Sequence, residues 1–155
     1  MFKSEKGVSA VEFALIAPLL FVITFGIIEF GILLFDKAVV TNASREGARK
    51  AILYNTDVDG NYEPIPEEDG IEVVNNYTSN HLISLGSTAV PAIEVNCYEH
   101  NDYSSEIDPC VTQGDVKVIV TYTYDFLVFP NLLSLLGSSF AGTMDLVGTT
   151  LMRME

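Results

Sequence analysis

The sequence predicts an α+β protein in which one long N-terminal helix, and then a second helix, precede a small antiparallel sheet of about three strands. Residues 13–35 form an apolar run, helical spacing continues beyond it, and the last part of the chain alternates with period two. Strands that follow helices in this way favour α+β over a parallel α/β fold. A chain of 155 residues has room for one small body and an anchor.

The apolar run from Phe13 to Phe35 contains a single ionisable side chain, that of Glu29. As a helix it would be about 34 Å long, which is enough to cross the hydrocarbon core of a bilayer. The run is too long for the apolar core of a secretory signal peptide, so we expect it to stay on the mature chain. Pro18 removes one backbone hydrogen bond inside the run and should kink the helix there.

Helical spacing continues past the apolar run. Residues 38–53 place small or apolar side chains on one face and charges on the other. Glu46 and Lys50 have a favourable i,i+4 spacing, whereas Arg45 and Arg49 share a face and should contact carboxylates elsewhere or lipid head groups. One helix from residue 8 to about residue 53 would be roughly 69 Å long.

The rest of the chain predicts a linker, a helix and a sheet. Residues 55–70 are typical of a linker, and Pro66 near its end, with the acidic residues behind it, predicts a helix start. This second helix should run to about Ser84 and end at Gly86. The predicted strands are residues 92–97, 116–124 and 142–153, with a short apolar helix or lid at residues 130–137.

The negative charge is concentrated in the body. Residues 1–50 hold six basic and five acidic side chains, whereas residues 51–155 hold two basic and sixteen acidic ones. Such a surface repels phosphate backbones, so we expect no nucleic-acid partner. It is typical of an exported domain kept soluble by its charge.

Cys97 and Cys110 are the only cysteines, and no metal-type spacing surrounds them. A disulfide between them would stabilise the fold by about 3 kcal/mol in the loop-entropy treatment and would require an oxidising compartment. The alternative is a pair of free thiols in a cytoplasmic domain. A mass shift on reduction separates the two.

The sequence carries no motif for catalysis. It lacks a glycine-rich phosphate loop, a nucleophile elbow, a histidine-rich metal motif and a CxxC pair. Residues 57–61 are similar to a calcium loop, but Gly60 comes too early for an EF-hand and the downstream Glu is misplaced. The acidic loop with Glu99, Asp102, Glu106 and Asp108 is a second oxygen-rich candidate, and the sequence leaves calcium binding by these loops open. Apart from that open question, we therefore expect no enzyme activity, no metal, no cofactor and no small-molecule substrate.

A carboxylate stands at an unusual place near the N-terminus. Gly7 follows a short leader with Lys3 and Lys6, and Glu12 comes five residues later inside an apolar stretch. A charge at membrane depth costs a few kcal/mol and is therefore usually functional. The alternative without a functional role is a glutamate at the membrane interface, attracted to the positive end of the helix dipole.

Gly7, Glu12 and Phe13 resemble the prepilin cleavage site of the Tad (tight adherence, Flp-type) branch of type IV pilins. The block Ala43–Arg49 and residues 29–31 resemble TadE-like pseudopilins, and residues 152–155 match more loosely. The resemblance assigns Gly7 and Val8 to the cleavage site, Glu12, Phe13 and Glu29 to subunit assembly, and Arg45, Glu46, Gly47 and Arg49 to a stalk motif.

The resemblance implies a pilin-like minor pilin or pseudopilin that assembles with or initiates a Tad pilus for surface adhesion. Residues 1–7 would be the leader, 8–54 the transmembrane and stalk helix, and 55–155 the soluble body. Prepilin peptidase would cut between Gly7 and Val8, and Glu12 would then meet the new α-amino group of a neighbouring subunit. Glu29 would pair with a basic residue of another subunit's stalk or mark the outer membrane boundary.

The implied partners are the major Flp-type pilin, a sister pseudopilin, the peptidase, and the inner-membrane assembly platform with its ATPase. The protein would span the inner membrane once, with its body outside the cytoplasm, and later reach the pilus or cell surface. The competing interpretation is a membrane-anchored periplasmic binding or sensory domain, which would keep its leader.

Overall fold

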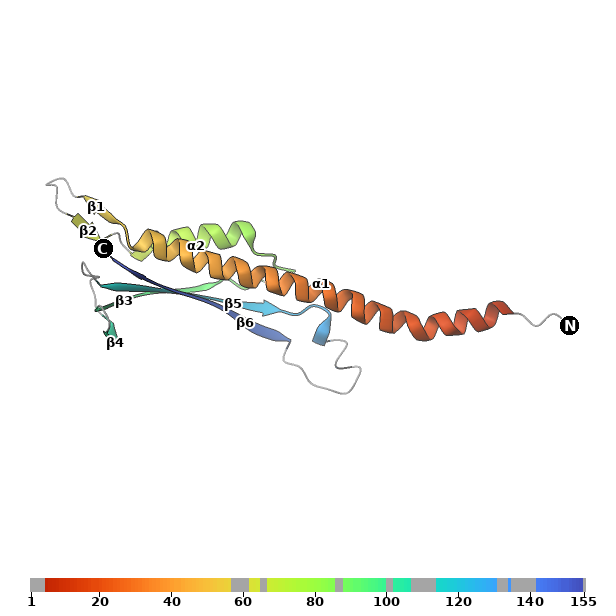
Figure 1. The fold of residues 1–155 in the computed structure, drawn as a ribbon. Coiled ribbons are helices and arrows are strands. Elements are labelled where there is room, and N and C mark those ends of the chain that lie inside the picture. Colours follow the sequence, from red (N-terminus) through yellow and green to blue (C-terminus); the bar gives the residue numbers. More distant parts are fainter. Residues whose placement is uncertain are drawn as a thin grey trace. The chain divides into compact units, whose positions relative to one another are not determined.

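The structure is a computed structural model that describes residues 5–56, 62–64, 67–85, 88–99, 102–106, 114–130, 134 and 142–154. Its elements are α1 (Glu5–Ala51), β1 (Tyr54–Thr56), β2 (Tyr62–Pro64), α2 (Glu67–His81), β3 (Ala92–Glu99), β4 (Asp102–Glu106), β5 (Asp115–Asp125) and β6 (Thr143–Arg153) (Figure 1). The predicted α+β class is confirmed.

The chain divides into two compact units, and the division falls inside α1. The first unit comprises Met1–Leu33 and Phe126–Gly142, and the second comprises Leu34–Asp125 and Thr143–Glu155. The first unit therefore joins the apolar part of α1 to the connection between β5 and β6. The second unit contains the rest of α1, α2 and both sheets.

In the first unit, α1 forms a continuous helix through Pro18. The ribbon changes direction in its red N-terminal part (Figure 1). Thr24, a polar residue in the apolar run, donates its hydroxyl to the Leu20 carbonyl oxygen at 2.8 Å. This local bond satisfies the hydroxyl without a partner from outside the helix.

The main sheet of the second unit has four antiparallel strands in the order β4-β3-β5-β6. β5 is central and pairs with β3 from Asp115↔Tyr98 to Thr121↔Ala92. It pairs with β6 along its whole length. The predicted strands correspond to β3, β5 and β6, and β4 is an additional strand that the sequence pattern did not indicate.

Two further boundaries differ from the predictions. The segment predicted as a linker contains a short antiparallel pair, β1 with β2, in which Tyr54 lies opposite Pro64. The helix α2 ends at His81 rather than near Ser84, and Gly86 lies outside the described residues.

The core of the second unit lies between the sheet and the helices. Alternate residues of β5 are buried, namely Val116, Val118, Val120, Tyr122 and Tyr124. Val40, Ala43 and Ala48 of α1 are fully buried, as is Val74 of α2. Complete burial of one such valine contributes about 1.5–3 kcal/mol, so this face fixes the strand register.

Gly47 lies where α1 crosses α2. A Cβ at this position would overlap the Val74 Cγ2 and would lie 3.5 Å from Val118 Cγ1. The helices approach closely here because residue 47 has no side chain. The stalk-motif glycine therefore has a packing role within the chain.

Candidate membrane anchor and assembly surface

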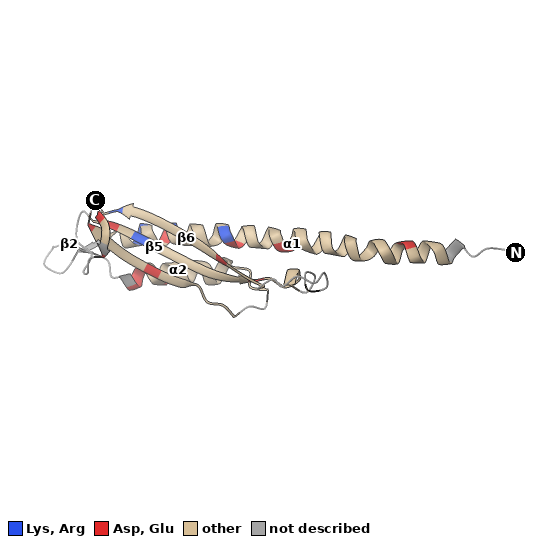
Figure 2. Cartoon of the chain, turned by 90° about the horizontal axis from the view of Figure 1, so that it is seen from below, with Lys and Arg blue, Asp and Glu red and all other residues tan. Residues whose placement is uncertain are grey.

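The N-terminal part of α1 exposes a large apolar surface. Among the described residues there is one helix, Gly7–Ala51, whose length and composition would allow it to cross a membrane. Almost none of its most apolar stretch is buried. In Figure 2 the N-terminal half of α1 is almost entirely tan, and residues 7–33 contain no Lys or Arg. Exposed apolar surface of this extent marks contact with lipid or with other helices.

The predicted cleavage site lies at the start of this helix. α1 begins at Glu5, so Gly7 and Val8 are already helical. Val8 is 63% exposed and Phe13 is 67% exposed. A Cβ added at Gly7 would meet nothing within 4 Å. A side chain at residue 7 would therefore meet no described part of the chain outside its own helix.

Glu12 is exposed on the same part of the helix. It makes no hydrogen bond or ion pair with any residue that the structure describes. An unpaired carboxylate is expensive in hydrocarbon, so it would need a partner from another molecule there. The geometry of one chain leaves this position open for such a partner.

Glu29 has an intramolecular role that the sequence did not indicate. Its carboxylate is 2% exposed and accepts hydrogen bonds from three consecutive backbone N–H groups, those of Leu127, Val128 and Phe129. The bonds from Val128 and Phe129 measure 3.1 Å each. Glu29 thus ties the connection after β5 to the apolar helix, within the first unit.

An apolar hollow of about 620 Å³ lies beside this contact. Its lining consists of Val22, Ile23, Gly26, Ile27, Phe30, Gly31 and Phe129. A Cβ at Gly26 would lie 3.5 Å from the Phe129 ring, so the ring rests against the helix where the side chain is smallest. None of the lining residues that the structure describes has a polar side chain that could orient a small ligand.

The stalk motif divides into an inward and an outward part. Gly47 packs inside, whereas Arg45 is exposed. Arg49 pairs with Glu46 through bonds of 2.6 and 3.1 Å. Lys50 lies 3.8 Å from Asp69 of α2 and is therefore not the partner of Glu46 that the i,i+4 spacing suggested. Exposed pairs of this kind contribute little to stability.

Two residues just after the apolar run connect α1 to the body. Asp36 is fully buried, and its Oδ1 accepts the Ile83 N–H at 3.0 Å. Its Oδ2 is also buried and has no hydrogen-bond partner among the described residues. Lys37 donates from Nζ to the Val147 carbonyl oxygen of β6. No periodicity in the sequence pointed to these contacts.

Cys97 is buried in β3 and is not a free thiol. Cys110 lies outside the described residues, so the pairing of the two cysteines stays a prediction. In the acidic segment, Asp102 accepts the Ser104 hydroxyl at 2.6 Å and the Ser104 N–H at 3.0 Å, which lowers its pKa. No cluster of possible metal ligands occurs among the described residues.

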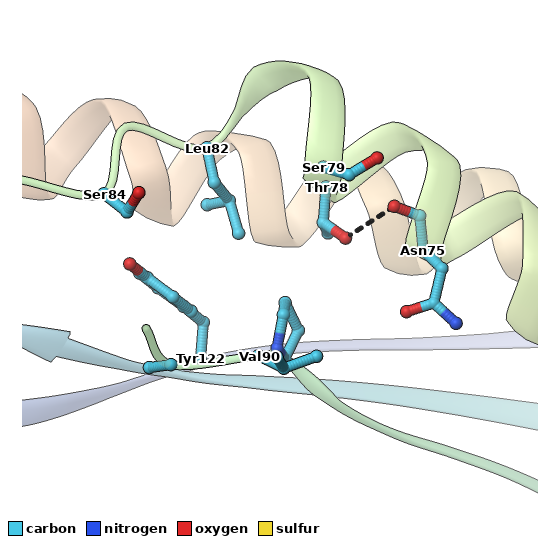
Figure 3. Close-up of a pocket in the computed structure, with 9 residues that line it drawn as sticks. Asn75, Thr78, Ser79, Leu82, Ser84, Val90 and Tyr122 are labelled. Carbon is cyan, nitrogen blue, oxygen red and sulfur yellow. Dashed lines mark hydrogen bonds between the residues drawn. The ribbon is translucent and has the colours of Figure 1, made fainter. Parts of the chain in front are cut away.

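A second hollow lies between α2 and the sheet (Figure 3). Its volume is about 210 Å³, below the usual 300–1,000 Å³ of ligand pockets. Among the described residues that line it, Tyr122 is the only titratable one, and the Thr78 hydroxyl on its wall donates to the Asn75 carbonyl oxygen at 3.1 Å. These described lining residues provide no acid–base pair.

Fold and surface together define a class: an α+β protein with one candidate membrane helix among the described residues, in which the exposed N-terminal half of that helix carries Glu12, a carboxylate without a hydrogen bond or ion pair to any described residue. Residues 7–49 match the family described as TadE-like protein. This confirms the TadE-like resemblance over the anchor and the stalk motif, and it supports association with Tad pilus machinery. Comparisons with curated proteins and with solved structures find no match.

Proposed function

We propose that this protein is a minor pilin or pseudopilin that assembles with or initiates a Tad pilus and so contributes to surface adhesion. The observation that carries the proposal is Glu12, which is exposed, has no partner in the described chain, and stands five residues after Gly7. The TadE-like match includes both residues.

In this proposal, prepilin peptidase cuts between Gly7 and Val8 and creates an α-amino group on Val8. The Glu12 carboxylate of one subunit then forms an ion pair with the Val8 ammonium group of its neighbour. Pairing the two charges offsets the desolvation that each would suffer alone in hydrocarbon. The exposed apolar side chains around them pack against the helices of the major Flp-type pilin and a sister pseudopilin.

The protein would wait in the inner membrane with its body outside the cytoplasm. The assembly platform and its ATPase would then extract it into the pilus or to the cell surface. The role is structural, with no catalytic step, no cofactor and no nucleic-acid contact. A body as large as residues 55–155 favours a minor subunit, because major Flp-type pilins consist of little more than the helix.

N-terminal sequencing of protein extracted from membranes tests the proposal. We expect Val8 as the first residue where the peptidase is active and Met1 where it is deleted. Gly7→Ile is the matched variant, because a side chain at residue 7 meets nothing within 4 Å and the fold should survive. It should remain uncut in both strains.

An intact leader on the wild-type protein in cells with active peptidase would overturn the proposal. The anchored binding or sensory domain would then be the better assignment. The hollow beside Tyr122 gives that alternative weak support because of its small volume.

A further inference from the structure

We infer that residues 126–130, at the start of the connection between β5 and β6, form a second membrane contact that Glu29 holds against α1 at the outer edge of the bilayer. The occupant of this surface is the lipid itself. The inference rests on the membrane anchoring that the proposed function includes, but it does not depend on cleavage at Gly7.

The position of Glu29 along α1 supports this depth. It lies sixteen residues after Phe13, which is about 24 Å along a helix, whereas a hydrocarbon core is about 30 Å thick. The apolar run continues to Phe35. A segment that is hydrogen-bonded to Glu29 therefore lies at the depth of the apolar part of α1, within the same compact unit.

The backbone N–H groups of residues 126–129 have hydrogen-bond acceptors within the protein. Irregular backbone is tolerated at membrane depth only where it is buried in protein or lines a water-filled cavity, because its polar groups need partners there. Glu29 accepts the N–H groups of Leu127, Val128 and Phe129, and Phe126 donates its N–H to the Gly142 carbonyl oxygen at 2.8 Å. Pro130, the next residue, has no N–H to satisfy.

The side chains of the segment fit a lipid partner. Leu127 is 56% exposed and Phe129 is 39% exposed. Phe129 lines one apolar hollow together with Ile27 and Phe30, which are 69% and 58% exposed, so its surface continues that of the anchor.

Charge distinguishes the connection from the rest of the body. Residues 126–142 contain no Asp, Glu, Lys, Arg or His, although residues 51–155 hold sixteen acidic side chains. An uncharged stretch in so acidic a body avoids the cost of bringing charges to the bilayer. This is why we assign the surface to lipid.

Single tryptophans test the inference, because the chain has none of its own. The variants Leu127→Trp and Phe129→Trp of the full-length protein are reconstituted into phosphatidylethanolamine–phosphatidylglycerol vesicles with and without brominated acyl chains. We expect brominated lipid to quench both, and acrylamide in the water to quench them weakly. The inference would be overturned if acrylamide quenched both tryptophans as strongly as it quenches a tryptophan in the soluble body and brominated lipid quenched neither.

Two control positions separate failure of the inference from failure of the anchor. Phe21→Trp, in the apolar run, should be quenched by brominated lipid. Val90→Trp, 78% exposed outside that run, should be quenched by acrylamide alone. If Phe21→Trp responds to bromine and the two variants in residues 126–130 do not, the anchor stands and the second contact is excluded. If Phe21→Trp fails as well, membrane anchoring itself is wrong.

The role of Glu29 is tested in the Phe129→Trp background. Glu29→Ala removes the acceptor of the backbone N–H groups, so acrylamide quenching should rise and quenching by brominated lipid should fall. Glu12→Ala, the other carboxylate at membrane depth, is the matched control and should leave both signals unchanged. An equal response to the two substitutions would contradict the tethering role of Glu29.

Discussion

Gly148 of β6 lies directly against the backbone of Val40 in α1. A Cβ at residue 148 would stand 2.6 Å from the Val40 carbonyl oxygen, 2.9 Å from its carbonyl carbon and 3.0 Å from the Thr41 Cα. All three are backbone atoms, which cannot move aside as a flexible side chain can. The stalk part of α1 therefore reaches the sheet only because β6 has a glycine here.

Gly148→Ala should destabilise the protein by about 1–3 kcal/mol, because the new methyl group must push the helix away from the sheet. Chemical denaturation of the detergent-solubilised protein, followed by circular dichroism, measures this change. Gly70→Ala in α2 is the matched control, since its Cβ would make ordinary contacts at 3.5 and 3.6 Å. That replacement should leave stability unchanged or raise it by up to about 1 kcal/mol. Equal effects of both would contradict the close approach.

The second prediction concerns Asp36, whose two carboxylate oxygens differ in their hydrogen bonding. Its Oδ1 accepts the Ile83 N–H, whereas its buried Oδ2 has no partner among the described residues. Asp36→Ala should cost about 1–3 kcal/mol by leaving a backbone donor unsatisfied. Asp36→Asn keeps an acceptor and removes a buried charge, so it should cost less than Asp36→Ala or even stabilise the fold. The same denaturation measurement ranks the two variants, and the reverse order would show that Ile83 does not depend on this carboxylate.

Tyr103 should make stability depend on alkaline pH. Its hydroxyl donates to the Asp115 Oδ2 at 2.7 Å, and this hydrogen bond is the main cause of the raised pKa of Tyr103. The folded state therefore holds the proton more tightly than the unfolded state. The contribution is fully present below the unfolded tyrosine pKa of about 10 and is lost as pH rises through the folded-state pKa.

Comparison of the wild type with Tyr103→Phe across this pH range measures the effect. The difference in unfolding free energy should shrink above about pH 10. In an absorbance titration, the variant should lack one tyrosine that ionises above the ordinary range. A difference in stability that stays constant with pH would show that the hydrogen bond to Asp115 does not hold the Tyr103 proton more tightly in the folded state.

The elements that depend on local pattern were predictable. The apolar run, and the helical spacing of small and charged residues after it, predicted α1. The alternation from Val116 to Tyr124 predicted β5 together with its buried face. These signals come from residues close in the chain, whose period directly reflects which face is buried.

The elements that depend on distant partners were missed. β4 reads Asp102-Tyr103-Ser104-Ser105-Glu106, without apolar alternation, and long-range polar contacts such as Tyr103 with Asp115 and Asn96 with Glu106 accompany its pairing. The contact between Glu29 and Leu127 joins residues 98 positions apart. No local period encodes such a contact. The sequence alone therefore did not decide whether Glu29 marks the membrane boundary or pairs with a basic residue of another subunit.

The outward residues of the stalk motif yield a prediction that separates stability from assembly. Arg49 is 70% exposed and pairs only with the neighbouring Glu46 in the described chain, while Arg45 is exposed as well. Arg45→Ala and Arg49→Ala should leave the denaturation midpoint unchanged, because exposed charges contribute little. If the motif contacts another subunit, co-purification with the other pilins should fall. Loss of stability in these variants would instead make the motif structural, as it is at Gly47.

Glu12 provides the prediction that bears most directly on assembly. Because Glu12 is exposed and makes no hydrogen bond or ion pair with the described residues, Glu12→Ala should fold and be cut after Gly7 like the wild type. It should nevertheless be missing from sheared pili, because the amine of Val8 would lack its partner in the apolar surroundings. Intact mass of the membrane pool and immunoblots of the pilus fraction measure the two steps separately. Glu72→Ala, an exposed glutamate of α2, is the control and should behave like the wild type in both. Normal incorporation of Glu12→Ala would show that the carboxylate pairs with no amine, and loss of cutting would place its role at the peptidase instead.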